Sequence, residues 1–162
     1  MNFNNPKYQV YALVTISIII SLALNVIRSN PISMIAHDLK KIDNIDELVN
    51  SNEPSGIVEI GIDIAKDLYE QGTLFIDARA EEYYNDGHIP GAICSDELDK
   101  LIDKIYSFDN LERAFVVYCS DDDCGSSEEL SYQLYDQGFE SIYLFKGGWK
   151  QWLENNLPAK YY

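Results

Sequence analysis

Short apolar runs alternate with helical patterns along the chain from Gly56 onward. β-prone apolar runs predict strands over 57–60, 74–76, 114–118 and 141–145. Apolar side chains at helical intervals predict helices over 62–70, 81–86, 97–106, 126–135 and 149–154. Because strands and helices alternate regularly, we expect βα units, a mostly parallel central sheet and a three-layer α/β domain.

The amino-terminal segment has a different pattern. Val10 to Ile27 are eighteen residues without a charge, flanked by Lys7 and Arg28. At ~1.5 Å per residue they cover about 27 Å of a ~30 Å hydrocarbon core. The stretch is longer than the ~7 to 15 apolar residues of a signal peptide. It therefore predicts one uncleaved membrane helix, with a cleaved signal peptide and a buried helix as alternatives. Basic residues flank both ends, so the charge rule leaves the orientation open.

These patterns divide the chain into three parts. We expect a membrane anchor over 1–28, a linker over 29–55 and a folded domain over 56–160. The linker holds prolines and scattered Asn, Asp and Ser around a short helical pattern at 42–49.

Charge is distributed unevenly over the 162 residues. The net charge is −15, and residues 1–50 hold four basic and four acidic side chains, so the rest of the chain carries the whole excess. Such a surface repels nucleic acid and anionic lipid headgroups. Three cysteines are too few for a disulfide framework, and no pattern of Cys and His predicts a metal site.

Cys119 is the candidate nucleophile. It ends the predicted strand 114–118, and the short loop after it opens onto a helix beginning near Ser126. Backbone N–H groups at a helix amino terminus converge on one point and stabilise a thiolate or a persulfide anion. The alternative is that Cys119 is a small buried hydrophobic residue.

Three motifs stand in a fixed order along the domain. They are Asp77-Ala78-Arg79 with Glu82, Tyr84 and the run Gly87 to Ala92; Tyr118-Cys119; and Lys146-Gly147-Gly148-Trp149 with Trp152. In residues and spacing the chain resembles the rhodanese-like family over about 56–160.

The resemblance implies a sulfurtransferase without a cofactor or a metal. The Cys119 thiolate would take the outer sulfur of a donor, hold it as a persulfide and pass it to a thiol acceptor. The loop that would hold this sulfur consists of Ser120, Asp121, Asp122, Asp123, Cys124, Gly125 and Ser126. A membrane anchor before a single such domain is similar to one arrangement in the family, which implies a single-pass protein with an extracytoplasmic domain.

Four further residues are expected to support the site rather than react. Arg79 could pair with Glu82 or with Asp77 and so fix the loop after the strand. His88 lies in a turn, where a hydrogen-bonding role is favoured over a role as catalytic base.

The active loop departs from the family pattern. Active members usually carry a basic residue where this chain has Cys124, and often a glycine where it has aspartates. At ~6 to 8 Å and an effective dielectric of about 20 to 40, each carboxylate opposes a thiolate by roughly 1 to 3 kcal/mol before screening. Three alternatives remain: a sulfurtransferase, a non-catalytic module that binds a basic protein through the acidic loop, and a redox switch in which Cys124 resolves Cys119.

Overall fold

The structure is a computed structural model that describes residues 6–27, 39–42, 56–108, 114–121 and 123–162. It divides into two compact units, Met1–Asp38 and Leu39–Tyr162. Within the first unit, α1 (Pro6–Ile27) is a single continuous helix. Its Lys7–Asn25 portion is long and apolar enough to cross a membrane, and signal sequences meet the same criterion.

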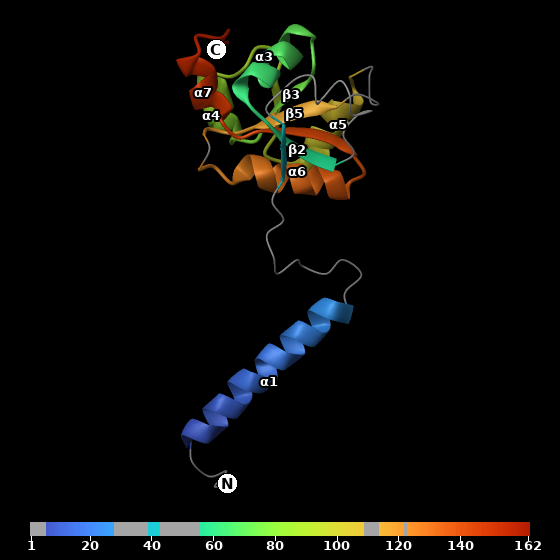
Figure 1. Ribbon diagram of the computed structural model, residues 1–162, viewed down its shortest axis with the longest axis vertical. Coiled ribbons are helices and arrows are strands. Elements are labelled where there is room, and N and C mark those ends of the chain that lie inside the picture. The colour runs from blue at the N-terminus through green and yellow to red at the C-terminus, as the bar shows by residue number, and fades with distance from the viewer. Residues whose placement is uncertain (1–5, 28–38, 43–55, 109–113, 122) are drawn as a thin grey trace. The chain divides into compact units, whose positions relative to one another are not determined.

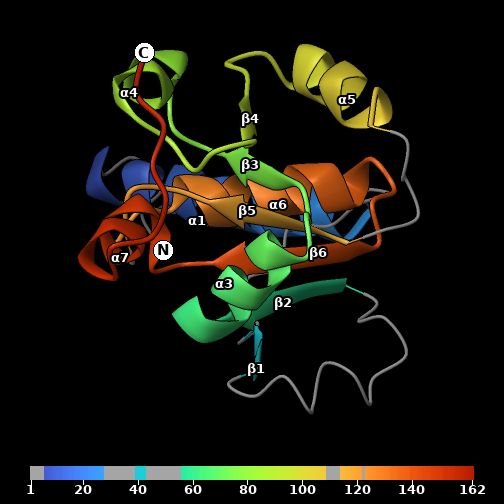
Figure 2. The same ribbon diagram turned by 90° about the horizontal axis from the view of Figure 1, so that it is seen from above.

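The second unit contains a six-stranded sheet in which every strand pair is parallel. The strand order is β1-β2-β6-β5-β3-β4, and β5 lies between β6 and β3 (Figure 2). The strands are β1 (Lys40–Ile42), β2 (Gly56–Ile60), β3 (Phe75–Asp77), β4 (Ile93–Cys94), β5 (Phe115–Tyr118) and β6 (Ser141–Phe145). Since β5 is central, the residue that follows it lies at the middle of the carboxyl edge of the sheet.

Helices cover both faces of the sheet. They are α3 (Ile62–Glu70), α4 (Glu81–Asp86), α5 (Leu98–Tyr106), α6 (Ser126–Asp136) and α7 (Gly148–Glu154). Figure 1 shows α3 and α7 on one side and α6 on the other. This arrangement confirms the predicted three-layer α/β fold.

Two apolar clusters fill the space between the layers. Val116 and Tyr118 of β5 contribute to the cluster that also holds Trp152 of α7. Phe115 and Val117 contribute to the opposite cluster with helices α5 and α6. Successive side chains of a strand point to opposite faces of the sheet, and both faces of this central parallel strand are covered by helices. The strand β5 therefore contributes to both clusters.

The elements predicted from 57 onward are present, with bounds that differ by at most one residue. The predicted strand 74–76 is displaced by one residue, so Asp77 belongs to β3. β4 was not predicted, and neither was β1, which lies inside the expected linker. Ile42 ends β1 instead of beginning a helix, and the rest of the predicted helical pattern, 43–49, lies outside the described residues.

Candidate active site

Cys119 follows the last residue of β5 at the carboxyl edge of the sheet. Only 2% of its surface is exposed. The structure joins it by a disulfide to Cys124, with the two Cα atoms 6.2 Å apart. The loop between them is therefore closed into a ring at the carboxyl end of the central strand.

The loop leads into the amino terminus of α6. Gly125 is the N-cap and provides no side-chain cap; its carbonyl accepts the N–H of Glu129. The N–H groups in the first turn of a helix have no partner within the helix, so they are available to an anion at this end. Ser127 is buried in the same turn, and its Oγ makes no hydrogen bond within the described part of the chain.

The first turn of α7 packs against the backbone of Cys119. Trp149 N–H donates to the Cys119 carbonyl and Lys150 N–H to the Ser120 carbonyl, both at 2.8 Å. Gly148 has φ +58°, and a Cβ there would lie 2.5 Å from the Cys119 carbonyl oxygen. Glycine at 148 therefore allows the two backbones to approach closely enough for both hydrogen bonds.

A buried ion pair supports the neighbouring strand. Arg79 Nη2 lies 2.6 Å from Asp77 Oδ2, and Arg79 Nε donates to Asp77 Oδ1 at 2.9 Å. Tyr118 O–H donates to the same carboxylate at 2.7 Å, across from β5 to β3. Arg79 also donates to the Gly87 carbonyl at 2.7 Å. Of the two partners considered from the sequence, Arg79 pairs with Asp77, while Glu82 is exposed on α4.

This network changes the titration of its members. Burial by itself lowers the pKa of Arg79, but the hydrogen bond and charge of Asp77 outweigh it and raise the pKa. Burial, with Asp77 adding to it, raises the pKa of Tyr118 far above its usual range. Both groups therefore keep their protons, and Arg79 lies 5.2 Å from the ring centroid of Trp149 as a cation–π partner.

His88 supports the turn after α4. It is 1% exposed, its Nδ1 lies 2.8 Å from the Tyr84 carbonyl, and its ring stacks on the Tyr84 ring at 3.8 Å. Its backbone pairs with Lys160 in an antiparallel bridge. Burial, together with Tyr162, raises the pKa of Tyr84 to about 12. These contacts are those of a residue that holds the carboxyl-terminal segment to the domain.

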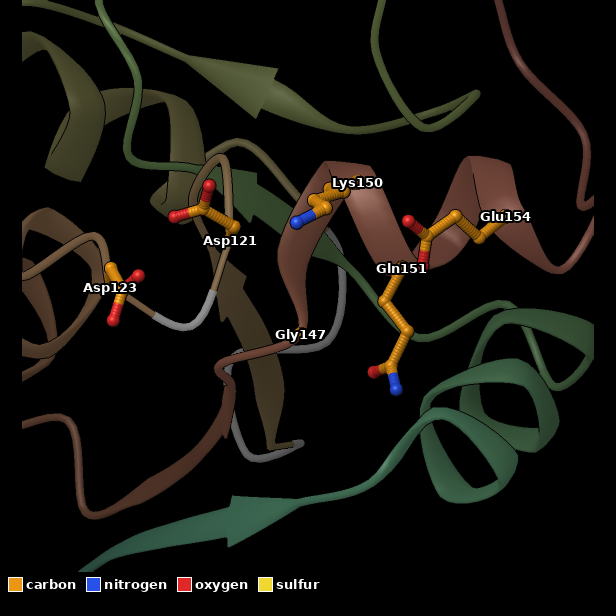
Figure 3. Close-up of a pocket in the computed structure, with 6 residues that line it drawn as sticks. All are labelled: Asp121, Asp123, Gly147, Lys150, Gln151 and Glu154. Carbon is orange, nitrogen blue, oxygen red and sulfur yellow. The ribbon is translucent and has the colours of Figure 1, made fainter.

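A polar pocket of about 160 Å³ adjoins the Cys119 loop. Its lining residues come from that loop, from the N-cap of α7 and from α7 itself: Asp121, Asp123, Gly147, Lys150, Gln151 and Glu154. Figure 3 shows the Lys150 side chain extending toward the loop segment with Asp121, and Gln151 pointing away from it. Three carboxylates and one ammonium group line the pocket, so its potential is negative.

Lys146 stands at the end of β6 between two more carboxylates. Its Nζ lies 3.4 Å from Glu59 Oε2 and 3.5 Å from Glu128 Oε2. Burial lowers the pKa of Lys146, and Glu128 and Glu59 raise it by more, so the net shift is upward. Lys146 therefore stays protonated, and the two carboxylates balance its positive charge.

The third cysteine is separate from the loop. Cys94 ends β4 at the edge of the sheet and is buried, and its Sγ donates to the Arg79 carbonyl at 3.1 Å. Burial, with nearby Asp77, raises the pKa of the Cys94 thiol to about 12. A thiol so fully protonated at neutral pH is a poor nucleophile.

The structure thus brings the described loop residues together and adds others that the sequence did not indicate. Asp121 is half-buried, Ser120 and Asp123 are exposed, and Asp122 lies outside the described residues. The residues missed are Tyr118 as a partner of Asp77, and Lys150, Gln151 and Glu154 at the pocket. The available signal for the last three was their place on the predicted helix that follows the Gly147-Gly148 pair. Within the described ranges, no cluster of three His, Cys, Asp or Glu side chains could hold a metal ion.

Fold and site together define a parallel α/β domain that places a cysteine, after its central strand, beside a helix amino terminus. The rhodanese-like domain family matches residues 62–155, more than half of the chain. The chain therefore belongs to the rhodanese-like domain family.

Relatives of known name and structure agree with this assignment. The thiosulfate sulfurtransferase GlpE of Pseudomonas fluorescens is 34% identical over 96 residues, which are 59% of this chain and 84% of the relative. The Alr3790 protein of Anabaena sp. superposes with a TM-score of 0.53 and 28% identity, over 63% of this chain and 82% of that structure. The BH2092 protein of Bacillus halodurans shares the fold, with a TM-score of 0.55, 22% identity and coverage of 73% and 87%.

Proposed function

We propose that this protein is a membrane-anchored sulfurtransferase that carries sulfane sulfur as a persulfide on Cys119. The observation that carries the proposal is the position of Cys119, directly after the central strand and beside the amino terminus of α6. The GlpE relative is a thiosulfate sulfurtransferase, which supports the same reaction class here.

The chemistry needs only groups of this loop. The Cys119 thiolate attacks the outer sulfur of the donor, a new S–S bond forms, and the remainder of the donor leaves with the electron pair of the broken bond. The persulfide anion is stabilised by the loop N–H groups and by the partial positive charge of the helix end. An acceptor thiolate then takes the outer sulfur and restores Cys119. No metal or cofactor enters these steps.

The charges around the loop bear on the choice of donor. Asp121, Asp123 and Glu154 line the adjoining pocket with Lys150 as their counter-charge, and Lys146 is occupied by Glu59 and Glu128. A dianionic donor such as thiosulfate is repelled there, so a less anionic persulfide or a protein donor with a basic surface is favoured.

Neutralising the pocket tests this preference. Asp123→Asn removes one of the negative charges that repel thiosulfate, so we expect kcat/KM for thiosulfate to rise. The increase should be limited to about 2- to 10-fold, because Asp123 is exposed and its charge is screened by solvent. The value for a neutral persulfide donor should stay within about twofold, which makes that donor the internal control. An equal change for both donors would contradict an electrostatic role of the pocket.

The anchor rests on α1. At ~1.5 Å per residue its Lys7–Asn25 portion spans about 28 Å, close to the thickness of a hydrocarbon core. We propose one membrane crossing with the domain on the extracytoplasmic side. Alkaline carbonate extraction should leave the full-length chain in the membrane pellet, and protease added to intact cells lacking an outer barrier should digest the domain. A shortened, soluble chain would instead identify α1 as a cleaved signal sequence.

Two observations favour second candidates. The acidic pocket suits a non-catalytic module that binds a basic protein, and the Cys119–Cys124 disulfide suits a thiol redox switch. Intact mass spectrometry separates the three. A gain of about 32 Da at early time points that Cys119→Ser abolishes supports the sulfurtransferase, and no change with any donor supports the binding module. Oxidation to the disulfide with no earlier gain of sulfur and no release of sulfide supports the switch.

A further inference from the structure

The disulfide between Cys119 and Cys124 shows that a second cysteine sulfur can reach the sulfur of Cys119. Cys124 lies five residues after Cys119, and their Cα atoms are 6.2 Å apart in the structure. The loop therefore has a conformation in which the sulfur of Cys124 reaches the sulfur of Cys119. That conformation coexists with the backbone hydrogen bonds from Trp149 and Lys150 to the two residues that begin the loop.

We propose that Cys124 resolves the Cys119 persulfide, so that this protein releases the transferred sulfur as sulfide. The inference rests on the proposed function, since it needs a sulfur on Cys119. The protein would then act as a persulfide-reducing enzyme that consumes an external dithiol, rather than only passing sulfane sulfur to an acceptor.

The step balances without any other reactant. The Cys124 thiol attacks Sγ of Cys119 in line with the persulfide bond; the Cys119–Cys124 bond forms and the bond to the outer sulfur breaks. The outer sulfur leaves with that electron pair and the Cys124 proton, as hydrosulfide. Over loading and resolution together, two thiol sulfurs have been oxidised to a disulfide, and one sulfane sulfur has been reduced to sulfide.

Turnover then requires a two-electron reductant of the dithiol class. Cys119 is 2% exposed and Cys124 is half-buried, so an incoming thiolate reaches the Cys124 sulfur more easily. Attack there expels Cys119 as a thiolate, the leaving group that the end of α6 stabilises. The second thiol of the reductant then frees Cys124 and regenerates both loop thiols.

The remaining cysteine cannot replace Cys124 in this scheme. Cys94 lies on β4, and β3 separates this strand from β5. Its Sγ is buried and engaged with the Arg79 carbonyl, as described above. It therefore provides a matched control: Cys94→Ala removes one thiol without touching the loop.

The experiment is a single turnover with the full chain in detergent micelles. The protein is reduced with dithiothreitol, freed of reductant and mixed with a slight excess of thiosulfate or of an organic hydropersulfide. These donors leave sulfite or a thiol when they lose their outer sulfur, so sulfide comes only from the resolving step. Sulfide, protein thiols and intact mass are then measured. The wild type and Cys94→Ala should each release about one sulfide per chain and become about 2 Da lighter than the reduced protein. Cys124→Ser and Cys124→Ala should keep a gain of about 32 Da and release no sulfide, and Cys119→Ser should show neither change.

The outcomes distinguish the two proposals. A wild-type protein that keeps the additional sulfur and releases no sulfide would overturn the role of Cys124 while leaving the sulfurtransferase in place. If neither the wild type nor Cys124→Ser takes up sulfur, both proposals fail. The wild-type result decides the question alone, so a misfolded variant would not leave it open.

Discussion

Replacement of Gly148 by alanine tests whether the first turn of α7 holds the Cys119 loop in place. At φ +58° an L residue costs about 1 to 2 kcal/mol. The new Cβ would also lie 2.5 Å from the Cys119 carbonyl oxygen and 3.0 Å from the Ser120 carbonyl carbon, and backbone atoms cannot rotate away. The α7 turn and the loop must therefore move apart.

Such a movement weakens both 2.8 Å hydrogen bonds between the two backbones. Each is worth about 0.5 to 1.5 kcal/mol, so the total cost of Gly148→Ala is about 2 to 5 kcal/mol. The matched control is Gly138→Ala: Gly138 has φ +96°, but nothing lies within 4 Å of its added Cβ. That substitution should cost only the backbone term of about 1 to 2 kcal/mol.

Urea unfolding of the full chain in detergent, followed by tryptophan fluorescence, measures the difference. The two tryptophans of the chain, Trp149 and Trp152, both lie in α7, so the signal reports on this domain. We expect the midpoint of Gly148→Ala to lie about 1 M urea below that of Gly138→Ala. Persulfide formation on Cys119 should also slow by about 10- to 100-fold in Gly148→Ala alone, because the nucleophile is displaced. Equal midpoints and equal rates for the two variants would refute the close packing of turn and loop.

Three further predictions concern buried groups around the site. Arg79→Met leaves the Asp77 carboxylate buried without its counter-charge and should lower the unfolding free energy by about 3 to 5 kcal/mol. The control, Glu82→Gln on the exposed face of α4, should change it by less than about 0.5 kcal/mol. Similar urea midpoints for the two variants would argue against the ion pair. Ser127→Ala removes a buried hydroxyl with no partner among the described residues, so the midpoint should stay within about 0.5 kcal/mol of the wild type or rise, and a loss above about 1 kcal/mol would reveal an important hydrogen bond. With the loop disulfide intact, Cys94 is the free thiol, and burial raises its pKa from 9.0 to about 12. The folded protein therefore holds the thiol proton more tightly than the unfolded chain does. This contribution to the unfolding free energy is fully present below pH 9 and is lost as the pH rises toward 12. Alkylation by iodoacetamide should accordingly stay slow in the folded protein at pH 9, and rapid labelling there would contradict the burial of Cys94.

Much of the fold follows from local patterns. The helix α5 carries Leu98, Leu101, Ile102 and Ile105 at helical spacing, so its existence and its buried face were predictable. The short strands were not: β4 has two residues, and β1 begins with two lysines. These segments are strands because β3 and β2 offer them hydrogen-bonding partners, which is a property of the assembled sheet rather than of their own residues.

The site divides in the same way. Cys119 and its loop were found because a strand, a loop and a helix start follow one another directly in the sequence. The place of Lys150 and Glu154 beside that loop depends on how α7 packs against it, and residues 119 and 150 are far apart in the chain. The hydroxyl of Tyr118 was missed because, in an apolar run, a tyrosine is read as a core residue; its bond to Asp77 appears only when β5 pairs with β3.

The central claim is that Cys119 carries sulfur, and the intact mass of the sulfur-loaded chain tests it most directly. Reduced full-length protein in detergent would be exposed to polysulfide or thiosulfate, quenched within seconds by alkylation and compared with Cys119→Ser. We expect early time points to show a species about 32 Da heavier than the equally alkylated reduced chain, with the sulfur located on the peptide that contains Cys119, and no such species in Cys119→Ser. If the folded wild-type protein takes up no sulfur from either donor at any time point, the sulfurtransferase assignment is wrong.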